Sequence, residues 1–360
     1  MMRSKCALAG YGLLLTAVVA GADDKVWSAG PIDFSGLVDG YYSLNFNHPA
    51  SRTNQLRNFD VKANQFSLNM AKFTMEHAAD PVGFRVDLGF GRAFDLIHGG
   101  EKDPGVMRNV QQAYFSVKPP KAGGLQIDFG KFVTSAGAEV IETHSNWNYS
   151  RSLLFALAIP YYHFGVRTSM PLHKNFTAGF QLVNGWNNVE DNNSGKTVGL
   201  TGALTTSKVS WYHNFYAGPE KTDTNKGLRY VYDTTLLVTP TPKVSFYINY
   251  DYGVEKLIGA GSNHWAGVAG AARFAVNEWF ALAPRLEWFN DADGFSTGTA
   301  QKLKEFTMTA EFKLKDGILM RPEYRRDWSD NPFFERGTGG TYKNQDTLLL
   351  GLVAYFGPKK

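Results

Sequence analysis

The stretch Val82-Gly83-Phe84-Arg85-Val86-Asp87-Leu88-Gly89-Phe90 places an apolar side chain at every second position, with small or charged residues between. The stretch 244–252 repeats this pattern, with valine, phenylalanine, isoleucine and tyrosine alternating with serine, tyrosine, asparagine and aspartate. Successive side chains of a β-strand point to opposite faces, so a period of two predicts strands whose two faces meet different surroundings. Signs of helix are scarce, and the sequence therefore predicts an all-β chain.

About sixteen segments after residue 30 follow this alternation. We expect strands at 32–46, 64–77, 82–91, 109–118, 124–133, 161–170, 175–184, 196–205, 207–217, 227–238, 243–253, 263–275, 279–289, 304–314, 317–327 and 345–357. Pro284 and Pro322 weaken two of these predictions, because a proline without an N–H removes a ladder hydrogen bond and usually marks a bulge or an edge. In the last segment aliphatic residues occupy both faces, so we expect its inward side to pack against a loop or the first strand.

The connections between these segments alternate between very short and long along the whole chain. Short turns such as 78–81 and 315–317 follow every other strand, and polar loops rich in glycine and asparagine, such as 47–63 and 328–344, follow the rest. An up-and-down barrel in the bacterial outer membrane has this organisation, with tight turns in the periplasm, long loops outside and an even number of strands. We therefore predict a transmembrane antiparallel β-barrel of about 16 strands, with 14 and 18 left open as alternatives.

The composition excludes several other classes of protein. Of the 360 residues, 43% are hydrophobic and 14% aromatic, and no periodic glycine is present, which excludes collagen, coiled coils and disordered polymers. The formal charge of +4 comes from 37 basic and 33 acidic residues, too balanced for a nucleic-acid partner. With one cysteine and no metal-binding histidine motif, we expect no metal and no cofactor.

The N-terminus has the pattern of a secretory signal. Arg3 and Lys5 precede an apolar run, and small residues follow at Ala20-Gly21-Ala22. The run of about 14 apolar residues is shorter than the roughly 20 that a spanning helix needs. We expect residues 1–22 to be a signal peptide, removed with Cys6, and 23–360 to form a single barrel domain.

Several motifs resemble a known family. They are Gly130-Lys131-Phe132-Val133-Thr134, Gly137-Ala138-Glu139-Val140-Ile141-Glu142, the run from Asn146 to Phe155, Pro160-Tyr161-Tyr162-His163-Phe164-Gly165-Val166-Arg167 and Asn184-Gly185-Trp186. Together with 82–91 they are similar to the OmpL-like porins, the second bacterial β-barrel porin family, most clearly over 64–200. The resemblance implies an outer-membrane barrel that acts as a passive pore, and it leaves the substrate open.

If the apolar faces point to lipid, charged residues of both signs face the lumen. The candidate pore-lining and selectivity residues are Arg85, Asp87, Asp128, Arg167, Asp251, Arg285, Glu287, Arg321, Glu323, Arg325 and Asp327. The four on 321–327 alternate on one face of a single strand. They predict either a transverse field that orients solutes in a pore or a ladder of ion pairs that stabilises the wall, and both interpretations stay open.

The longest connection, 134–160, is the candidate constriction loop. It carries Glu139, Glu142, His144, Trp147 and Arg151 beside an apolar run at 153–159. Such an apolar patch is unfavourable in water, so we favour a loop that folds into the barrel over the alternative, an external cap.

The leading hypothesis is a porin for small hydrophilic solutes or ions, in contact with outer-membrane lipid. The alternative is a surface barrel with a closed lumen that serves binding, adhesion or structure. Assembly with copies of itself, as a trimer, is left open. We expect no enzyme activity: His144 and Ser145 could suggest a lipase-like pair, but neighbouring residues on a strand point to opposite faces.

Overall fold

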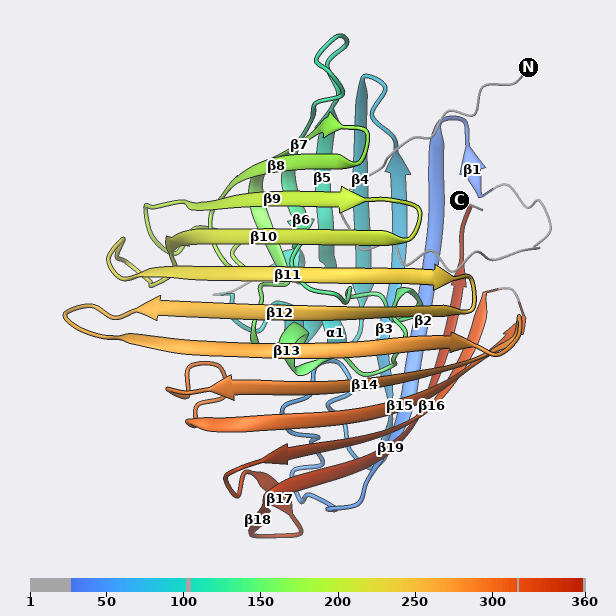
Figure 1. Ribbon diagram of the computed structural model, residues 1–360, viewed down its shortest axis with the longest axis vertical. Helices are drawn as coiled ribbons and strands as arrows, with labels where there is room; N and C mark the ends of the chain where they lie inside the picture. Colours follow the sequence, from blue (N-terminus) through green and yellow to red (C-terminus); the bar gives the residue numbers. More distant parts are fainter. Residues whose placement is uncertain (1–26, 102–104, 316, 359–360) are drawn as a thin grey trace.

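The computed structural model describes residues 27–101, 105–315 and 317–358, and the expected signal peptide lies outside these ranges. Sixteen long antiparallel strands form a closed barrel (Figure 1). They are β2 (Ile32–Asn45), β3 (Gln65–His77), β4 (Val82–Phe90), β5 (Val110–Val117), β6 (Gln126–Val133), β7 (Tyr162–His173), β8 (Phe176–Val183), β9 (Thr197–Thr205), β10 (Val209–Pro219), β11 (Leu228–Thr241), β12 (Val244–Lys256), β13 (Ser262–Ala275), β14 (Phe280–Asp291), β15 (Gln301–Lys315), β16 (Ile318–Ser329) and β19 (Asn344–Phe356).

Each strand pairs with its neighbours in the sequence, and the ring closes where the last long strand meets the first. In that closing ladder Thr347 of β19 lies opposite Asn45 of β2, and Phe356 lies opposite Gly36. The predicted all-β class and the barrel of sixteen strands are confirmed. Every predicted span overlaps one barrel strand, because alternation along a strand and turn length are local properties of the sequence.

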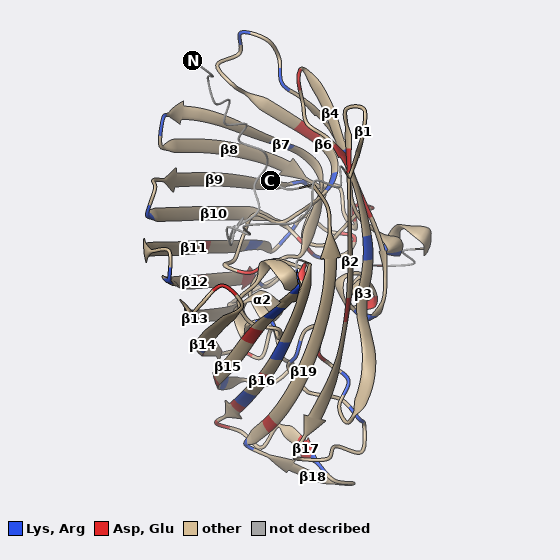
Figure 2. Cartoon of the chain, turned by 90° about the vertical axis from the view of Figure 1, so that its right-hand side faces the viewer, with Lys and Arg blue, Asp and Glu red and all other residues tan. Residues whose placement is uncertain are grey.

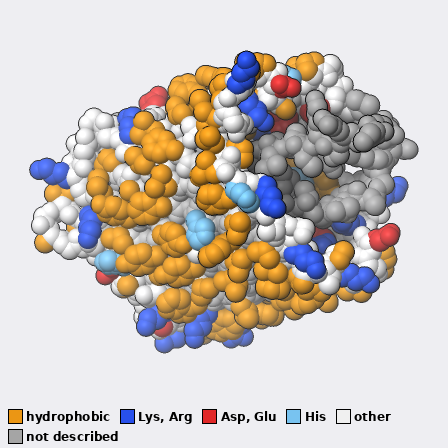
Figure 3. Space-filling view, turned by 45° about the horizontal axis from the view of Figure 1, so that its top comes forward, with side chains coloured by type: hydrophobic (Ala, Val, Ile, Leu, Met, Phe, Trp, Pro, Cys, Tyr) orange, Lys and Arg blue, Asp and Glu red, His pale blue; other side chains and the backbone are white. Residues whose placement is uncertain are grey.

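The two faces of the wall have opposite chemistry. On β15, Glu305, Thr307 and Thr309 are buried on the inward face, whereas Lys304 and Met308 are exposed on the outward face. Apolar side chains cover much of the outer face seen in Figure 3. Charged groups inside and apolar groups outside reverse the arrangement of a water-soluble protein, as expected of a wall that faces lipid. In the described part of the chain, no helix is long and apolar enough to cross a membrane.

The two prolines are accommodated where the ladders are interrupted. Pro284 lies in β14 opposite Met308 of β15, while the ladder to β13 skips the positions between Arg285 and Leu282. Pro322 of β16 lies opposite Leu350 of β19, and its ladder to β15 is interrupted in the same way. The missing N–H of each proline thus faces a gap in the ladder, and both strands continue past it.

Short elements that the sequence analysis did not predict lie before the first barrel strand and in the connections. They are β1 (Ser28–Ala29), α1 (Arg92–Ile97), the 3-10 helices η1 (Gly105–Asn109) and η2 (Thr143–Ser145), α2 (Leu153–Leu157), β17 (Phe334–Arg336) and β18 (Gly340–Tyr342). Ser152 caps α2 by accepting a hydrogen bond from the Phe155 amide (3.0 Å). These elements have too few residues to produce a periodic signal.

The lumen and the segment folded into it

The connection between β6 and β7, residues 134–160, lies inside the barrel; we call it the inner segment. Its Gly137 amide donates to Asp233 on β11 (3.0 Å), and its Asn148 amide group donates to Thr309 on β15 (2.7 Å). On a third part of the wall, the Tyr149 hydroxyl donates to Asp39 on β2 (2.6 Å). The strands that hold its two ends, β6 and β7, lie opposite β14 and β15 in the ring, so the inner segment crosses the lumen to reach these partners, with α2 visible in the interior (Figure 2).

Arg285 on β14 is the centre of the most highly charged contact between wall and inner segment. Its guanidinium lies 2.7 Å from Glu139 of the inner segment and 3.2 Å from each of Glu287 and Glu305 on the wall. It also donates to the Ser150 carbonyl (2.8 Å). The Arg285 side chain is 0% exposed, so its charge is compensated by carboxylates and a backbone carbonyl rather than by water.

Two arginines of β16 bind the backbone of the inner segment. Arg321 donates to the carbonyls of Thr143 and Asn146, both at 2.6 Å. Arg325 donates to the carbonyl of Arg151. Both arginines are 1% exposed. They therefore satisfy carbonyl groups that an irregular buried loop would otherwise leave without partners.

Glu323, between these arginines in the sequence, binds the opposite kind of backbone group. Its carboxylate accepts the amides of Tyr149 (2.6 Å) and Ser150 (3.0 Å) and the Thr309 hydroxyl (2.6 Å). Charged residues recur along β16 in Figure 2. Wall ion pairs of the kind considered from the sequence are present, such as Arg325 with Asp327 (2.8 Å), but the same side chains also hold the inner segment, which the sequence did not indicate.

A second connection, 47–63, also reaches inward and was not predicted to do so. Arg57 lies 2.7 Å from Asp60 of the same connection and 2.8 Å from Asp327 on β16. All three side chains are 1% exposed. A lone arginine in a polar loop gives no signal of this role, because its partner lies 270 residues away in the sequence.

The apolar part of the inner segment fills the space between the polar contacts. Leu153, Leu154 and Phe155 are buried in the same hydrophobic cluster as Tyr149. The Tyr149 ring lies against Gly351 of β19, where a Cβ atom would come within 2.1 Å of the ring. Glycine at this wall position therefore makes room for the tyrosine. The apolar run that favoured inward folding is buried inside the barrel.

Trp147, another predicted loop residue, packs against the wall at Tyr247 of β12, with ring centroids 5.1 Å apart. Arg151 donates to the carbonyls of Val140 (2.9 Å) and Ile141 (2.7 Å) and so holds the inner segment in its own fold. Trp147 therefore contacts the barrel wall, whereas Arg151 stabilises the conformation of the inner segment itself.

Predicted pore residues on β4, β6 and β7 pair with other residues of the wall. Arg167 lies 2.7 Å from Asp128, and both side chains are 6% exposed. Arg85 lies 2.9 Å from Glu76 and 3.1 Å from Asp87, and its side chain is 27% exposed near the short turn between β3 and β4. These charges thus lie on a part of the wall that holds the inner segment less directly.

One predicted residue stands apart from these ion pairs. Asp251 on β12 lies opposite Asp233 on β11, and both are 0% exposed. Asn249 donates to both carboxylates, at 2.8 Å to Asp233 and 3.4 Å to Asp251. Asp251 is therefore part of an acidic patch of the wall behind Gly137, in which Asn249 hydrogen-bonds to both carboxylates.

Glu142 and His144 place titratable groups of the inner segment next to the wall. Burial alone would raise the pKa of Glu142, but its hydrogen-bonded ion pair with Lys72 of β3 outweighs that effect and lowers the pKa to about 2. Burial lowers the pKa of His144 to about 4, and its ring stacks on Tyr355 at 4.8 Å. The premise that His144 and Ser145 lie on a strand was wrong: both belong to η2, where the short stretch 143–145 turns instead of extending.

The interior therefore contains both signs of charge, densely paired, around a segment that occupies the middle of the barrel. Among the described residues, no group of three or more histidine, cysteine, aspartate or glutamate side chains could hold a metal ion. A membrane barrel with a charged interior and an inward-folded connection defines the class: an outer-membrane protein of the porin type.

The comparison with protein families agrees with this class. Residues 31–356 match the model of the beta-barrel porin-2 family, OmpL-like, and the chain belongs to that family. A search of the curated proteins finds no match.

Solved structures with similar folds are also outer-membrane barrels. An anion-selective porin from Comamonas acidovorans has a TM-score of 0.59 at 11% identity, over 90% of this chain and 99% of that one. The outer-membrane channel DcaP of Acinetobacter baumannii has a TM-score of 0.60 at 11% identity, over 90% and 97%. A trimer form of OmpT from Vibrio cholerae has a TM-score of 0.58 at 13% identity, over 90% and 99%. The likeness establishes the fold, and with the family it places the protein in the outer membrane.

Proposed function

We propose that the protein is a porin that lets small hydrophilic solutes or ions diffuse passively across the outer membrane, and that residues 134–160 control the path. The porin family and the channel folds of similar structures favour a channel over an enzyme. The observation that carries the proposal is the set of contacts between the charged inward face of β14–β16 and the inner segment.

The burial of these contacts determines how the path opens. Arg285, Arg321 and Arg325 are each at most 1% exposed, so in this conformation they touch protein and not a water-filled channel. Solutes therefore pass when the inner segment shifts away from β14–β16, which exposes these arginines to the path. The same shift makes Glu287, Glu323 and Asp327 pore-lining, whereas Arg85 already has part of its surface open to water.

Conductance in a planar bilayer tests this function. Stepwise currents that scale with salt concentration are expected of the folded protein. In the double variant Arg321→Glu with Arg325→Glu, carboxylates would face the backbone carbonyls of the inner segment, so we expect longer openings and a reversal potential shifted towards cations. An unchanged reversal potential would remove these two residues from the path.

The filled lumen favours a second candidate function. A barrel whose interior stays packed could act at the cell surface through its external loops, with no transport. Persistent absence of current from correctly folded protein, and from the charge-reversed variant, would support this function over the porin.

We also propose that the protein assembles with copies of itself as a trimer. The solved trimer form of OmpT from Vibrio cholerae, which shares the fold, supports this assembly. Light scattering of the purified protein in detergent measures it: three times the chain mass is expected, and a monomer mass would exclude it.

A further inference from the structure

The extracellular rim of the barrel is uneven beside the connection between β4 and β5. β4, β5 and β6 have only 9, 8 and 8 residues, whereas β2 and β3 have 14 and 13. The ladder between β3 and β4 ends at the pair of Ala71 and Phe90, so residues 65–70 of β3 extend beyond it. The helix α1 packs against β3 here, and η1 packs against α1, β4 and β5.

This connection covers part of the outer face of the wall. Lys131 of β6 lies opposite Phe164 of β7 and two positions from Phe129, which is 45% exposed, so Lys131 points outward. It is nevertheless 0% exposed, because His98 lies 2.6 Å from its ammonium group and the Tyr162 ring lies 4.1 Å away. The residues that follow α1 therefore pack against the outside of the barrel.

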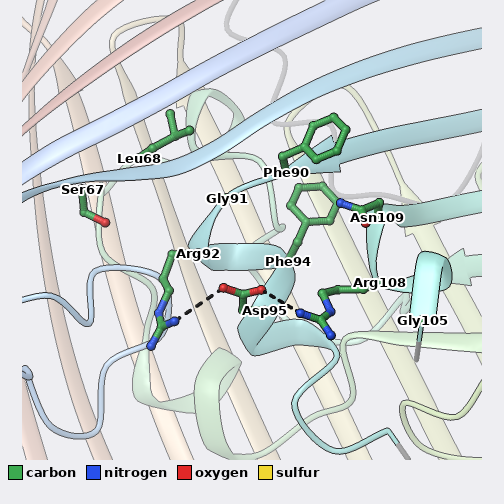
Figure 4. A pocket seen from close by; sticks show the side chains of 10 residues that line it. All are labelled: Ser67, Leu68, Phe90, Gly91, Arg92, Phe94, Asp95, Gly105, Arg108 and Asn109. Atoms are coloured by element: carbon green, nitrogen blue, oxygen red, sulfur yellow. Dashed lines mark hydrogen bonds and ion pairs between the residues drawn. The ribbon is translucent and has the colours of Figure 1, made fainter. Parts of the chain in front are cut away.

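A cavity of about 480 Å³ lies between this connection and the rim of β3 and β4. Leu68 and Phe90, which contribute to its lining, are 51% and 63% exposed on the lipid-facing side. Arg92, Asp95 and Arg108 line the same cavity, and Figure 4 shows the two arginines on either side of the aspartate. The cavity thus joins an apolar surface to a basic one.

Its charges suit an anion. Asp95 lies 3.5 Å from Arg92 and 3.6 Å from Arg108, so one carboxylate is shared by two guanidinium groups. The arginine side chains are 39% and 49% exposed, and Nε of Arg92 has no hydrogen-bond partner among the described residues. Guanidinium groups bind phosphate oxygens in pairs, and they do so best where water is partly excluded.

We propose that this cavity binds a phosphorylated glycolipid of the outer leaflet, of the lipid A class. Arg92 and Arg108 donate to the phosphate group, and an acyl chain lies along Leu68 and Phe90. A lipid is the occupant that meets both requirements, because the apolar half of the site opens to the membrane and the basic half lies at the rim where headgroups begin. The site is independent of the conducting path.

Native mass spectrometry of the full mature chain in detergent tests the site. The probes are bisphosphorylated lipid A, the same lipid without phosphates, and inorganic phosphate. The variant is Arg92→Gln with Arg108→Gln, and the matched control is Lys302→Gln with Lys304→Gln, two cations exposed on the outward face of β15 at the same rim. Leu68→Asn tests the acyl contact separately.

We expect the wild type and the lysine control to bind lipid A with equal affinity. The arginine variant should bind it at least about tenfold more weakly, and the wild type should bind the lipid without phosphates only weakly. Leu68→Asn should weaken lipid A without changing the response to inorganic phosphate. Equal lipid binding by the arginine variant would overturn the proposal. Inorganic phosphate that binds as tightly as the lipid would also overturn it, since the occupant would then be a free anion. So would an arginine variant that loses only self-association, since the occupant would then be a second copy of the chain.

Discussion

The two sides of the lumen wall carry charges of both signs but use them differently. On β14–β16, Arg285, Arg321 and Glu323 bind the inner segment, through its Glu139 side chain and its backbone. On the β6–β7 side, Arg167 binds Asp128, a partner on the neighbouring strand. Charge placement along a strand therefore decides which face is charged, whereas the role of each charge depends on what lies across the lumen.

The largest expected effect comes from removing the central arginine of the first side. Arg285→Ala leaves the buried Glu139 and Glu287 without an ion-pair partner and leaves Glu305 only Arg325, at 3.7 Å, so we expect the free energy of unfolding to fall by about 3–5 kcal/mol. Denaturant unfolding of the protein in detergent measures the change.

Arg167→Ala is the matched variant on the other side. Asp128 keeps hydrogen bonds from Ser116 (2.6 Å) and Gln126 (2.8 Å), so the expected loss is about 1–3 kcal/mol. Equal losses in the two variants would show that the two sides do not differ as described.

Glu323→Gln should have an intermediate effect that is confined to the inner segment. The glutamine side chain has one acceptor oxygen instead of two and no negative charge, so it cannot accept both the Tyr149 and the Ser150 amide as the carboxylate does. This weakens the attachment of the inner segment by about 2 kcal/mol. Hydrogen exchange at 143–155 should become faster, with more frequent channel openings. Glu76→Gln, which alters a partly exposed pair with Arg85, is the control, and equal acceleration there would contradict the assignment.

Acid should loosen the inner segment through His144. Because burial lowers its pKa to about 4, the packed state stays unprotonated while the released state, with a pKa near 6.5, takes up a proton. Packing is thus unaffected above about pH 6.5, weakens as the pH falls towards 4, and is about 1 kcal/mol less stable at pH 5.5. Glu142, with its pKa lowered to about 2, stays ionised in this range.

Hydrogen exchange at 143–149, corrected for intrinsic rates, measures this pH dependence. His144→Phe should abolish the change between pH 6.5 and 4. His213→Phe, on the outward face of β10, should leave it intact. A pH response that survives His144→Phe would assign the effect to another group.

The sequence was sufficient for the wall and insufficient for what fills it. Alternation and turn length identified all sixteen barrel strands, because each signal is contained within about ten residues. The inward side of Arg285 and Arg321 followed from the same alternation. Their partners did not, because an irregular segment has no period and its contacts join positions more than 100 residues apart.

Some contacts had a partial signal in the sequence. The alternation of the first strand predicts an inward position for Asp39, yet its hydrogen bonds to Thr143 and Tyr149 depend on how the inner segment folds. The apolar run at 153–159 pointed to burial without indicating where. Arg57 gave no signal at all, since its connection resembles an ordinary external loop.

A disulfide between the inner segment and the wall tests most directly whether that segment controls the path. A Cβ at Gly351 would lie 2.9 Å from Cγ of Tyr149, so the two Cβ atoms of Tyr149→Cys with Gly351→Cys would be at most about 4.4 Å apart, within disulfide range. Single-channel conductance of this variant should fall strongly on oxidation and return on reduction. Equal currents in both states would show that solutes cross the barrel without any movement of the inner segment.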